Sequence, residues 1–332
     1  MPAGVGRRAA VVALAVVAVL LVPAATAFAG NGGLLPPPAH SPNAHRIRDA
    51  YVFVMIFVGV VFVIVEGALL VLITRYRRGK RDRTQEGPQI HGSTRLEILW
   101  TVVPVVMLTA ICGYIFYKLP GINDAPPAAA ANQTTITVEG HQFYWLFRYP
   151  NGAVSIGTMI APAGDVVHEN ITAPASEVNH SWWVPELGGK TDAIPGQTNH
   201  SWFQAPIGTY VARCAELCGI QHALMDATVK VVPRAEYEAF IAARAAAPGG
   251  LDVGKEEWQG VCSSCHRLNE TYVGPALGGN PLLRDRDGIE NLVRHGLRQM
   301  PAVGENWSPE QIDALIAYTK TLPKQKANGF QS

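Results

Sequence analysis

The sequence predicts a multidomain membrane protein with a two-helix transmembrane hairpin, an all-β sandwich and an all-α C-terminal domain. Two long apolar runs separated by a basic loop predict the hairpin. Short runs of β-branched and aromatic residues between Thr134 and Pro233 predict the sandwich. A Cys-x-x-Cys-His motif among helical patterns after residue 250 predicts the third part. At 332 residues the chain has room for all three parts, and its net charge of +1 predicts no nucleic-acid partner.

The first 29 residues have the layout of a secretory signal peptide. Two arginines precede an apolar run from Ala9 to Val22, and small residues follow up to Ala29. Cleavage after Ala29 is the expected outcome. The alternative, an uncleaved membrane anchor, is weaker because this run is short for a bilayer. Residues 30–48 are rich in Gly, Pro and Asn, and we expect an exposed tail there.

Two apolar runs predict transmembrane helices at residues 49–74 and 96–119. The first contains the 24 residues from Ala50 to Ile73, which as a helix would extend about 36 Å and span a bilayer. Its only charge, Glu66, is expected to face a partner protein. Pro104 in the second run is expected to kink the helix without ending it.

The loop between these helices, residues 75–95, determines the expected orientation. Six basic residues lie between Arg75 and Arg83, and such loops remain in the cytoplasm. The far ends of both helices then face outward, and everything after Lys118 is extracytoplasmic. The sequence therefore predicts a two-helix protein of a bacterial cell membrane, in contact with lipid, with its larger part outside the cytoplasm.

A Pro- and Ala-rich linker at residues 120–133 leads into the β-rich segment, residues 134–233. Short strands separated by Gly and Pro turns suggest a sandwich or barrel, whose loops can hold ligands on a rigid frame. His141, His168 and His200 also lie in this segment. We expect these three to be surface residues or hydrogen-bonded structural residues.

The stretch Cys214–Met225 carries the clearest chemistry in this segment. It contains two cysteines, a histidine, a methionine and a glutamate within twelve residues, a set of ligands that favours copper. The two thiolates can bridge a pair of copper ions, with imidazoles from His222 and from His180 upstream. A disulfide and a zinc site are the alternatives, and Met225 argues against zinc. The predicted ligands are His180, Cys214, the carbonyl of Glu216, Cys218, His222 and Met225.

A helical, Ala-rich connector at residues 234–249 precedes the last domain, residues 250–325. Cys262, Cys265 and His266 form the attachment motif of c-type haem, in which two thioether bonds hold the haem and the histidine binds its iron. A redox Cys-x-x-Cys site would need a βαβ pattern, which is missing here. Met300 is the expected sixth ligand, with His295 as the alternative. Ser308 is expected to cap a terminal helix, followed by proline at its first position and a capping-box Gln311.

These motifs together resemble a known family. Cys-x-Glu-x-Cys-Gly-x-x-His-x-x-Met, with His-Ser-x-Trp-Val-Pro-Glu-Leu upstream, resembles the dinuclear copper (CuA) domain of cytochrome c oxidase subunit II. Residues 250–325 resemble a class I cytochrome c. The resemblance implies a Greek-key cupredoxin sandwich followed by an all-α cytochrome c domain, as in subunit II of a caa-type haem-copper oxidase.

That resemblance implies a function. Electrons would pass from cytochrome c or another donor to the haem, then to the copper pair, and then to subunit I, which reduces oxygen and translocates protons together with the other subunits. A tethered haem raises the local concentration of the donor. The Glu216 side chain would bind Mg²⁺ at the subunit I interface, with Asp192 nearby. Glu97, in Glu-x-x-Trp-Thr-x-x-Pro, would lie at the entrance of a proton path.

An aromatic segment is a candidate entry point for electrons. Phe143, Tyr144 and Trp145 match the segment that admits electrons in many subunits II, although Phe143 stands where tryptophan is usual. Tyr144 and Trp145 could equally be core residues.

Two alternative functions remain. The copper domain could instead serve a nitric oxide reductase, and a membrane-bound copper carrier is the non-enzymatic alternative.

Overall fold

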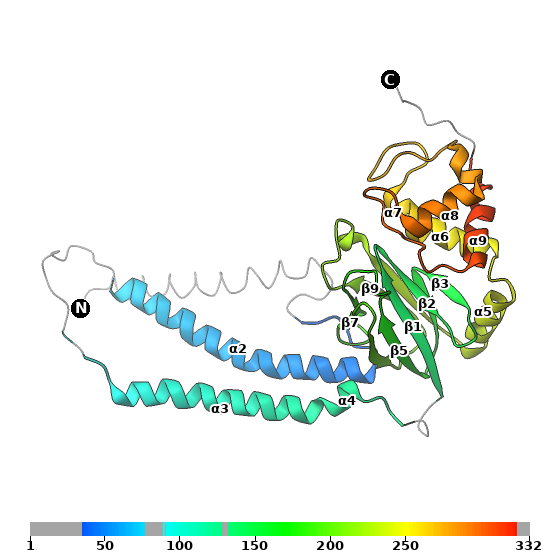
Figure 1. The fold of residues 1–332 in the computed structure, drawn as a ribbon. Helices are drawn as coiled ribbons and strands as arrows, with labels where there is room; N and C mark the ends of the chain where they lie inside the picture. The colour runs from blue at the N-terminus through cyan, green and yellow to red at the C-terminus, as the bar shows by residue number, and fades with distance from the viewer. Residues whose placement is uncertain (1–34, 77–88, 90, 128–131, 324–332) are drawn as a thin grey trace, which may run out of the picture. The chain divides into compact units, whose positions relative to one another are not determined.

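The computed structural model of the chain describes residues 35–76, 89, 91–127 and 132–323. The chain divides into two compact units (Figure 1). The first unit includes the two long helices from Arg46 to Pro120, and the second includes residues 39–45 and everything from Gly121 onward. The predicted signal peptide and most of the predicted basic loop lie outside the described residues.

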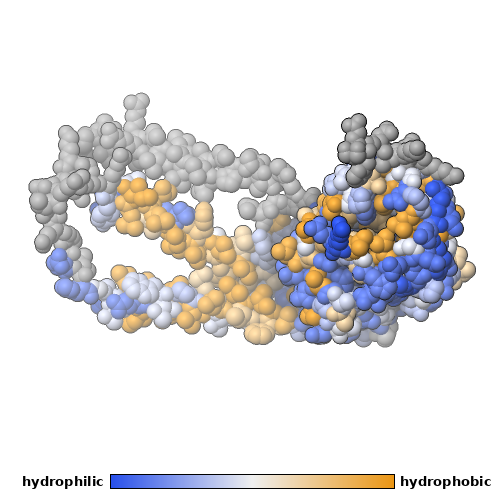
Figure 2. Space-filling model, turned by 45° about the horizontal axis from the view of Figure 1, so that its top comes forward, coloured by the Kyte–Doolittle hydropathy of each residue, from blue (hydrophilic) through white to orange (hydrophobic). Residues whose placement is uncertain are grey.

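Two apolar helices, α2 (Pro42–Arg75) and α3 (Thr94–Lys118), form the predicted hairpin. Both are long and apolar enough to cross a membrane, and hydrophobic side chains cover them (Figure 2). The end of α3 lies beside the start of α2, because Lys118 Nζ is 2.7 Å from Asp49 Oδ2. Pro104 lies inside α3 without ending it, as expected.

The predicted exposed tail is wrong for residues 39–45. Ser41 and Asn43 are buried against the sandwich, where Asn43 Nδ2 donates to the Trp202 carbonyl at 2.6 Å. Ser41 Oγ accepts from the backbone N–H of Gln204 at 3.1 Å. These polar side chains satisfy backbone groups beside an edge strand, and so order a segment whose composition alone suggested a loop.

Among the described residues of the second unit, ten strands follow a short helix α4 (Pro120–Asn123). They cover the segments predicted as strands and add short ones between them. The strands are β1 (Gln133–His141), β2 (Tyr144–Arg148), β3 (Val154–Ile156), β4 (Thr158–Pro162), β5 (Val166–Thr172), β6 (His180–Trp183), β7 (Thr191–Ala193), β8 (Thr198–Phe203), β9 (Gly208–Cys214) and β10 (Asp226–Val232).

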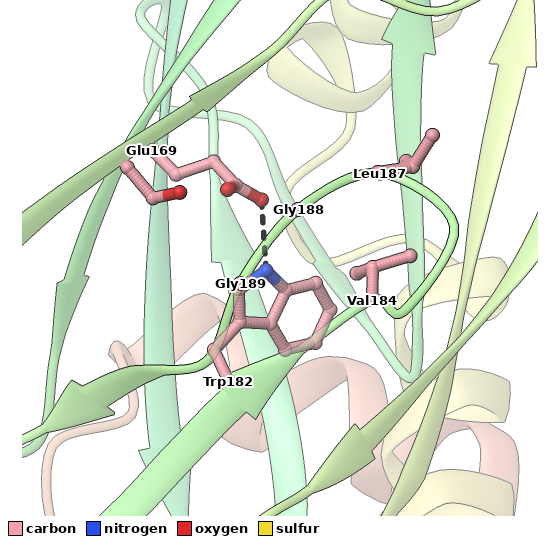
Figure 3. A pocket seen from close by; sticks show the side chains of 7 residues that line it. Glu169, Trp182, Val184, Leu187, Gly188 and Gly189 are labelled. Atoms are coloured by element: carbon pink, nitrogen blue, oxygen red, sulfur yellow. Dashed lines mark hydrogen bonds between the residues drawn. The ribbon is translucent and has the colours of Figure 1, made fainter. Parts of the chain in front are cut away.

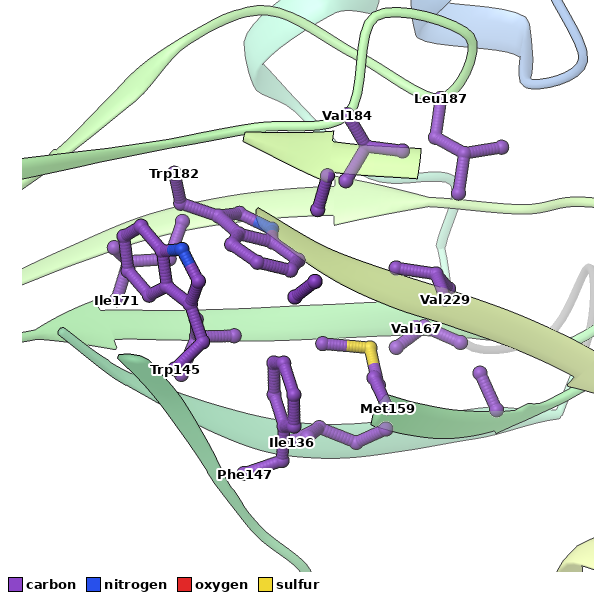
Figure 4. Close-up of a cluster of buried hydrophobic side chains, with 14 of the residues drawn as sticks. Ile136, Trp145, Phe147, Met159, Val167, Ile171, Trp182, Val184, Leu187 and Val229 are labelled. Atoms are coloured by element: carbon purple, nitrogen blue, oxygen red, sulfur yellow. The ribbon is translucent and has the colours of Figure 1, made fainter. Parts of the chain in front are cut away.

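The strands form a β-sandwich of two five-stranded sheets. One sheet has the order β3-β2-β1-β5-β8 and the other β4-β10-β9-β6-β7. The pairs β1 with β5 and β4 with β10 are parallel, and the remaining pairs are antiparallel. Large side chains from both sheets fill the space between them, among them Trp145, Phe147 and Trp182 (Figure 4). This core fixes the strand ends that carry the copper motif.

The predicted connector is the helix α5 (Arg234–Ala246), which packs on the sandwich through Tyr237 and Phe240. The last domain is helical, as predicted. The Ser308 cap, with Pro309 and Gln311, opens its final helix in a complete capping box. Its elements are α6 (Leu251–Glu257), the π-helical turn η3 (Trp258–Cys262), α7 (Ser263–Cys265), η4 (Pro281–Arg284), α8 (Arg286–His295) and α9 (Pro309–Thr319).

Candidate metal and haem sites

Three predicted ligands, His180, Cys214 and Cys218, meet at one end of the sandwich. His180 begins β6, and Cys214 ends the neighbouring strand β9. Their ligand atoms and that of Cys218 lie within 4.8 Å of one another, and all three residues are buried. Nδ1 of His180 is 3.9 Å from Cys214 Sγ, and the two sulfurs are 3.8 Å apart.

The loop from β9 to β10 folds back and adds three further donors. His222 Nδ1 and Met225 Sδ each lie 3.7 Å from Cys218 Sγ. The Glu216 carbonyl is 3.2 Å from Cys214 Sγ. A hydrogen bond from Cys214 N to the Met225 carbonyl, 3.1 Å long, closes the loop. All six residues predicted as ligands are therefore gathered in one place.

This set of donors fits a pair of copper ions. Two thiolates can bridge two metals, each metal can take one imidazole, and the thioether and carbonyl remain as weaker ligands. The two sulfurs are much farther apart than the roughly 2.05 Å of a disulfide bond, and both cysteines are free. A closed zinc site would use four nitrogen and sulfur ligands. It would leave Met225 and the Glu216 carbonyl without a role.

The two thiols interact strongly. The hydrogen bond between the two thiols, followed by contacts with His180 and backbone groups, lowers the pKa of Cys214. The thiolate of Cys214 in turn raises the pKa of Cys218. Cys214 is thus ionised first, and a metal held by both sulfurs would require the loss of the remaining thiol proton.

A carboxylate that the sequence analysis missed lies behind the ligand His180. Oε2 of Glu177 is 3.7 Å from His180 Nε2, the ring nitrogen that faces away from the sulfurs, and Oε1 is 3.5 Å from His141 Nδ1. Burial raises the pKa of Glu177, but the contacts with His141 and His180 outweigh it and lower the pKa to about 2. Such a partner orients a ligating imidazole. Its position three residues before His180 was the only signal in the sequence.

The three predicted aromatic residues have different environments. Trp145 is fully buried in the sandwich, and its ring lies 6.0 Å from the His180 ring. Tyr144 is also buried, and its hydroxyl contacts the C-terminal domain through Trp307 Nε1 at 3.0 Å. Phe143 is half-buried beneath the copper loop, where a Cβ on Gly219 would lie 2.9 Å from its ring. Core packing therefore accounts for Trp145.

The Cys262–His266 motif ends a π-helical turn and the short helix α7, and both cysteines are free. Nδ1 of His266 is 2.8 Å from the Pro275 carbonyl, which leaves Nε2 available for a metal. A Cβ on Gly274 would lie 2.3 Å from the His266 ring, so only glycine allows this approach. An open cavity of about 300 Å³ beside the ring is lined by Trp258 and Leu268, among others. These features fit a haem held by this motif.

Met300 and His295 were the two candidates for the opposite haem ligand. Met300 follows a tight turn in which its backbone pairs with Leu297 at 2.9 and 3.0 Å. His295 ends α8, and its Nδ1 contacts the Asn291 carbonyl of the same helix at 3.0 Å. Met300 remains the predicted ligand, because the contacts of His295 are those of a helix terminus.

The remaining predicted residues lie outside the ligand cluster. Glu97 is exposed in the first turn of α3. The side chain of Glu216 is exposed, so it is open to a cation even though its carbonyl points at Cys214. Asp192 is exposed on β7 and paired in register with Ser181. His168 and His200 contact polar neighbours on the surface, as expected.

A buried carboxyl group lies beside the strand that carries His180. Glu169 accepts a 2.8 Å hydrogen bond from Trp182 Nε1 (Figure 3). The two residues line a cavity of about 10 Å³ together with Gly188 and Ser201. Burial raises the pKa of Glu169 to about 7 despite the hydrogen bonds it accepts. The cavity has room for roughly one water molecule and for no larger ligand.

Comparison with known proteins places these sites in a family. Residues 29–117 match the transmembrane domain of cytochrome c oxidase subunit II, and residues 154–232 match its periplasmic domain. Over 329 residues the chain is 33% identical to a cytochrome c oxidase subunit 2 from Alkalihalophilus pseudofirmus, covering 90% of this chain and 93% of the relative. The chain belongs to the cytochrome c oxidase subunit II family.

The chain is also similar to other oxidase proteins. Residues 249–318 match the family described as cytochrome c oxidase, cbb3-type, subunit III. A cytochrome c oxidase subunit 2 from Bacillus sp. strain PS3 is 29% identical over 74% of this chain and 80% of its own length. The periplasmic domain of subunit II of cytochrome oxidase (CoxB) from Bradyrhizobium japonicum is 29% identical over 36% of this chain and 96% of that chain, with a TM-score of 0.33.

Membership in the subunit II family implies a CuA copper centre, and the fused cytochrome c domain implies a haem. The six clustered donors and the Cys-x-x-Cys-His motif are the residues that fit these groups. The chain is thus a subunit of an oxidoreductase complex, a haem-copper oxidase, and functions together with other oxidase subunits.

Proposed function

We propose that this chain is the subunit through which electrons enter a respiratory cytochrome c oxidase. Electrons pass from a donor to a covalently bound haem c, then to the CuA centre, and on to subunit I for oxygen reduction coupled to proton translocation. The observation that carries the proposal is the convergence of all six donors in a subunit that also contains a haem-attachment motif. Each group supplies one-electron chemistry when bound.

The residues of the chain hold the two groups in place. Cys214 and Cys218 would bridge the copper ions, while His180 and His222 would provide one imidazole each through Nδ1. A rigid sandwich behind the loop limits the movement of these ligands between oxidation states. Sharing one electron between two bridged ions would further reduce the geometric change that electron transfer requires.

In the C-terminal domain, Cys262 and Cys265 would form the thioether bonds to the haem. His266 would bind the iron through Nε2, with its ring oriented by the Pro275 carbonyl. Met300 would complete the iron site, and a thioether ligand raises the reduction potential compared with a second imidazole.

The donor reaches the haem rather than the aromatic segment. Tyr144 is only 2% exposed, and the C-terminal domain contacts its hydroxyl on the side opposite the sandwich core. A soluble cytochrome c therefore has no access to Tyr144 in this structure. We propose that cytochrome c or another reduced donor docks on the C-terminal domain.

The membrane arrangement follows from the hairpin and the basic loop. We propose that both redox domains lie outside the cytoplasm and that Glu97 lies at the cytoplasmic entrance of the proton path. The Glu216 side chain would bind Mg²⁺ at the subunit I interface. An alkaline phosphatase fused at residue 127 should be active in cells, and one fused within residues 77–88 inactive; the reverse pattern would refute the topology.

Metal and haem analysis of the purified full chain tests the proposal. Two coppers and one covalent haem per chain, with a seven-line copper hyperfine pattern in electron paramagnetic resonance, are the expected results. One copper with an ordinary four-line pattern, or zinc in its place, would show that the loop holds no copper pair. A chain with labile copper and no haem would support a copper carrier instead.

A further inference from the structure

The C-terminal domain is packed against the sandwich in a single buried cluster. Side chains from β2 and β3 meet side chains from the haem-domain helices, and a Cβ on Gly260 would lie 2.8 Å from Ile156. Backbone N–H of Ile156 also donates to the Glu256 carboxylate at 3.1 Å. The main members of the cluster are Tyr144, Leu146, Val154, Ile156, Trp258, Ile312 and Leu315.

One polar contact within this interface joins the two redox motifs directly. The amide of Gln221, which is 5% exposed, donates to the Ser264 carbonyl at 3.3 Å and lies 4.0 Å from Cys265 Sγ. Gln221 immediately precedes the copper ligand His222, and Ser264 and Cys265 immediately precede the haem ligand His266. A single side chain therefore spans from one set of ligands to the other.

A second chain of contacts also crosses the interface but is longer. Trp307 Nε1 donates to the Tyr144 hydroxyl at 3.0 Å, and the Tyr144 ring stacks on His141 at 4.7 Å. His141 then meets Glu177 at 3.5 Å, and Glu177 meets His180 at 3.7 Å. This route needs four contacts to reach a copper ligand, whereas the Gln221 route needs one.

We propose that Gln221 is a positioning residue that holds the haem-attachment segment against the copper loop and so sets the rate of electron transfer between them. The inference rests on the proposed relay and deepens it. In the step concerned, the reduced haem iron loses one electron and the oxidised copper pair gains it, and no bond is formed or broken. Gln221 neither binds a metal nor exchanges a proton; its amide fixes the separation of the two segments.

The test compares Gln221→Leu with a matched control, Ser176→Ala. The leucine keeps the volume of the side chain but cannot donate to Ser264. Ser176→Ala removes another polar contact between the domains, the one with Glu305, on exposed residues that belong to neither motif. Flash reduction of the haem in the purified full chain, carrying both groups, gives the rate of transfer to copper.

Gln221→Leu should slow this transfer at least about tenfold, as expected when a contact that positions two reacting groups is loosened. The copper resonance spectrum and both reduction potentials should stay unchanged, and Ser176→Ala should transfer at the wild-type rate. In the copper-depleted full chain, amide hydrogen exchange in residues 218–225 and 262–268 should rise for Gln221→Leu only. This last measurement remains informative if the variant alters copper binding.

Two outcomes would overturn the inference. One is an unchanged transfer rate for Gln221→Leu; if the rate falls for Tyr144→Phe at the same time, the coupling belongs to the longer route. The other is unchanged amide exchange for Gln221→Leu in the copper-depleted chain. If the wild-type haem never passes its electron to copper, the proposed relay itself fails, and this result is distinct from the other two.

Discussion

At the scale of single residues, Glu177 is a partly buried carboxylate outside the predicted ligand set that contacts the predicted ligand His180. Its carboxylate faces Nε2 of His180 at 3.7 Å and is 13% exposed. Because its pKa is lowered to about 2, it is ionised at neutral pH and favours an imidazole with a proton on that nitrogen. That tautomer leaves Nδ1 free to bind metal.

We predict that Glu177→Gln weakens copper binding by about tenfold or more, because loss of such a partner typically costs that much affinity. Copper titration against a competing chelator measures the effect. Glu238→Gln, which changes an exposed carboxylate on α5, is the control and should bind copper as the wild type does. Equal affinity of Glu177→Gln and the wild type would remove Glu177 from the site.

Glu257 presents the opposite case, a carboxyl group kept neutral. It is fully buried in the haem domain, and neither oxygen has a hydrogen-bond partner within the described part of the chain. Burial raises its pKa from 4.5 to about 9. The folded protein therefore keeps a proton that the unfolded chain releases, and stability should fall as pH rises from about 4.5 to about 9.

Glu257→Gln should stabilise the domain at pH 8 and leave a smaller difference in stability between pH 5 and pH 8, because an amide cannot ionise. Denaturant unfolding of the full chain at both values, followed by tryptophan fluorescence, provides the measurement. Glu270→Gln, at an exposed position, should keep the wild-type pH dependence. A wild-type pH dependence in Glu257→Gln would show that this carboxyl does not control it.

How well a site residue can be predicted from the sequence depends on how far along the chain its partners lie. The candidate ligands from Cys214 to Met225 and the Cys262–His266 motif are close in sequence, so their spacing alone predicts a site. Glu177 and Gln221 make contacts that exist only after folding. Their positions near His180 and His222 in the sequence therefore did not predict these contacts. His141 was expected to be structural, and its two carboxylate neighbours agree with that role.

At the scale of elements, the crossing of α6 and α9 determines how the haem domain closes. Gly254 allows the two helices to approach so closely that a Cβ there would lie 2.0 Å from the Ala314 carbonyl. Both residues are buried. A methyl group at this position has to push one helix away from the other.

Gly254→Ala should therefore destabilise the haem domain by about 1–3 kcal/mol or more, in the range known for overpacked cores. Thermal unfolding of the full chain measures the change. Lys255→Ala, on the exposed face of the same helix, is the control and should change stability by less than about 0.5 kcal/mol. No effect of Gly254→Ala would mean that the helices do not cross as described.

Element-scale predictions succeeded where a pattern of side chains was sufficient. Short runs of β-branched and aromatic residues predicted the β-rich segment, and the Ser308 signal located the start of α9. The segment 39–45 was misjudged because its order comes from hydrogen bonds to Trp202 and Gln204, which lie far away in the sequence. The pairing of strands within each sheet likewise could not be predicted from local sequence patterns.

At the scale of the whole second unit, the contact between the sandwich and the haem domain was not predictable. The sequence of the connector, residues 234–249, predicts a helix and a tethered haem but does not reveal where the haem domain lies relative to the sandwich. The buried cluster that includes Tyr144 and Ile156 instead packs the two domains together. The two domains are thus held together by a packed interface and not by the connector alone.

The measurement that tests the central claim most directly is the order in which the two centres are reduced. In the purified full chain, rapidly mixed with a reduced cytochrome c, the haem should be reduced first. It should then lose its electron with the same rate constant with which the copper pair gains one. Reduction of copper at an unchanged rate in a variant with Cys262→Ala and Cys265→Ala, which cannot attach haem, would contradict the relay.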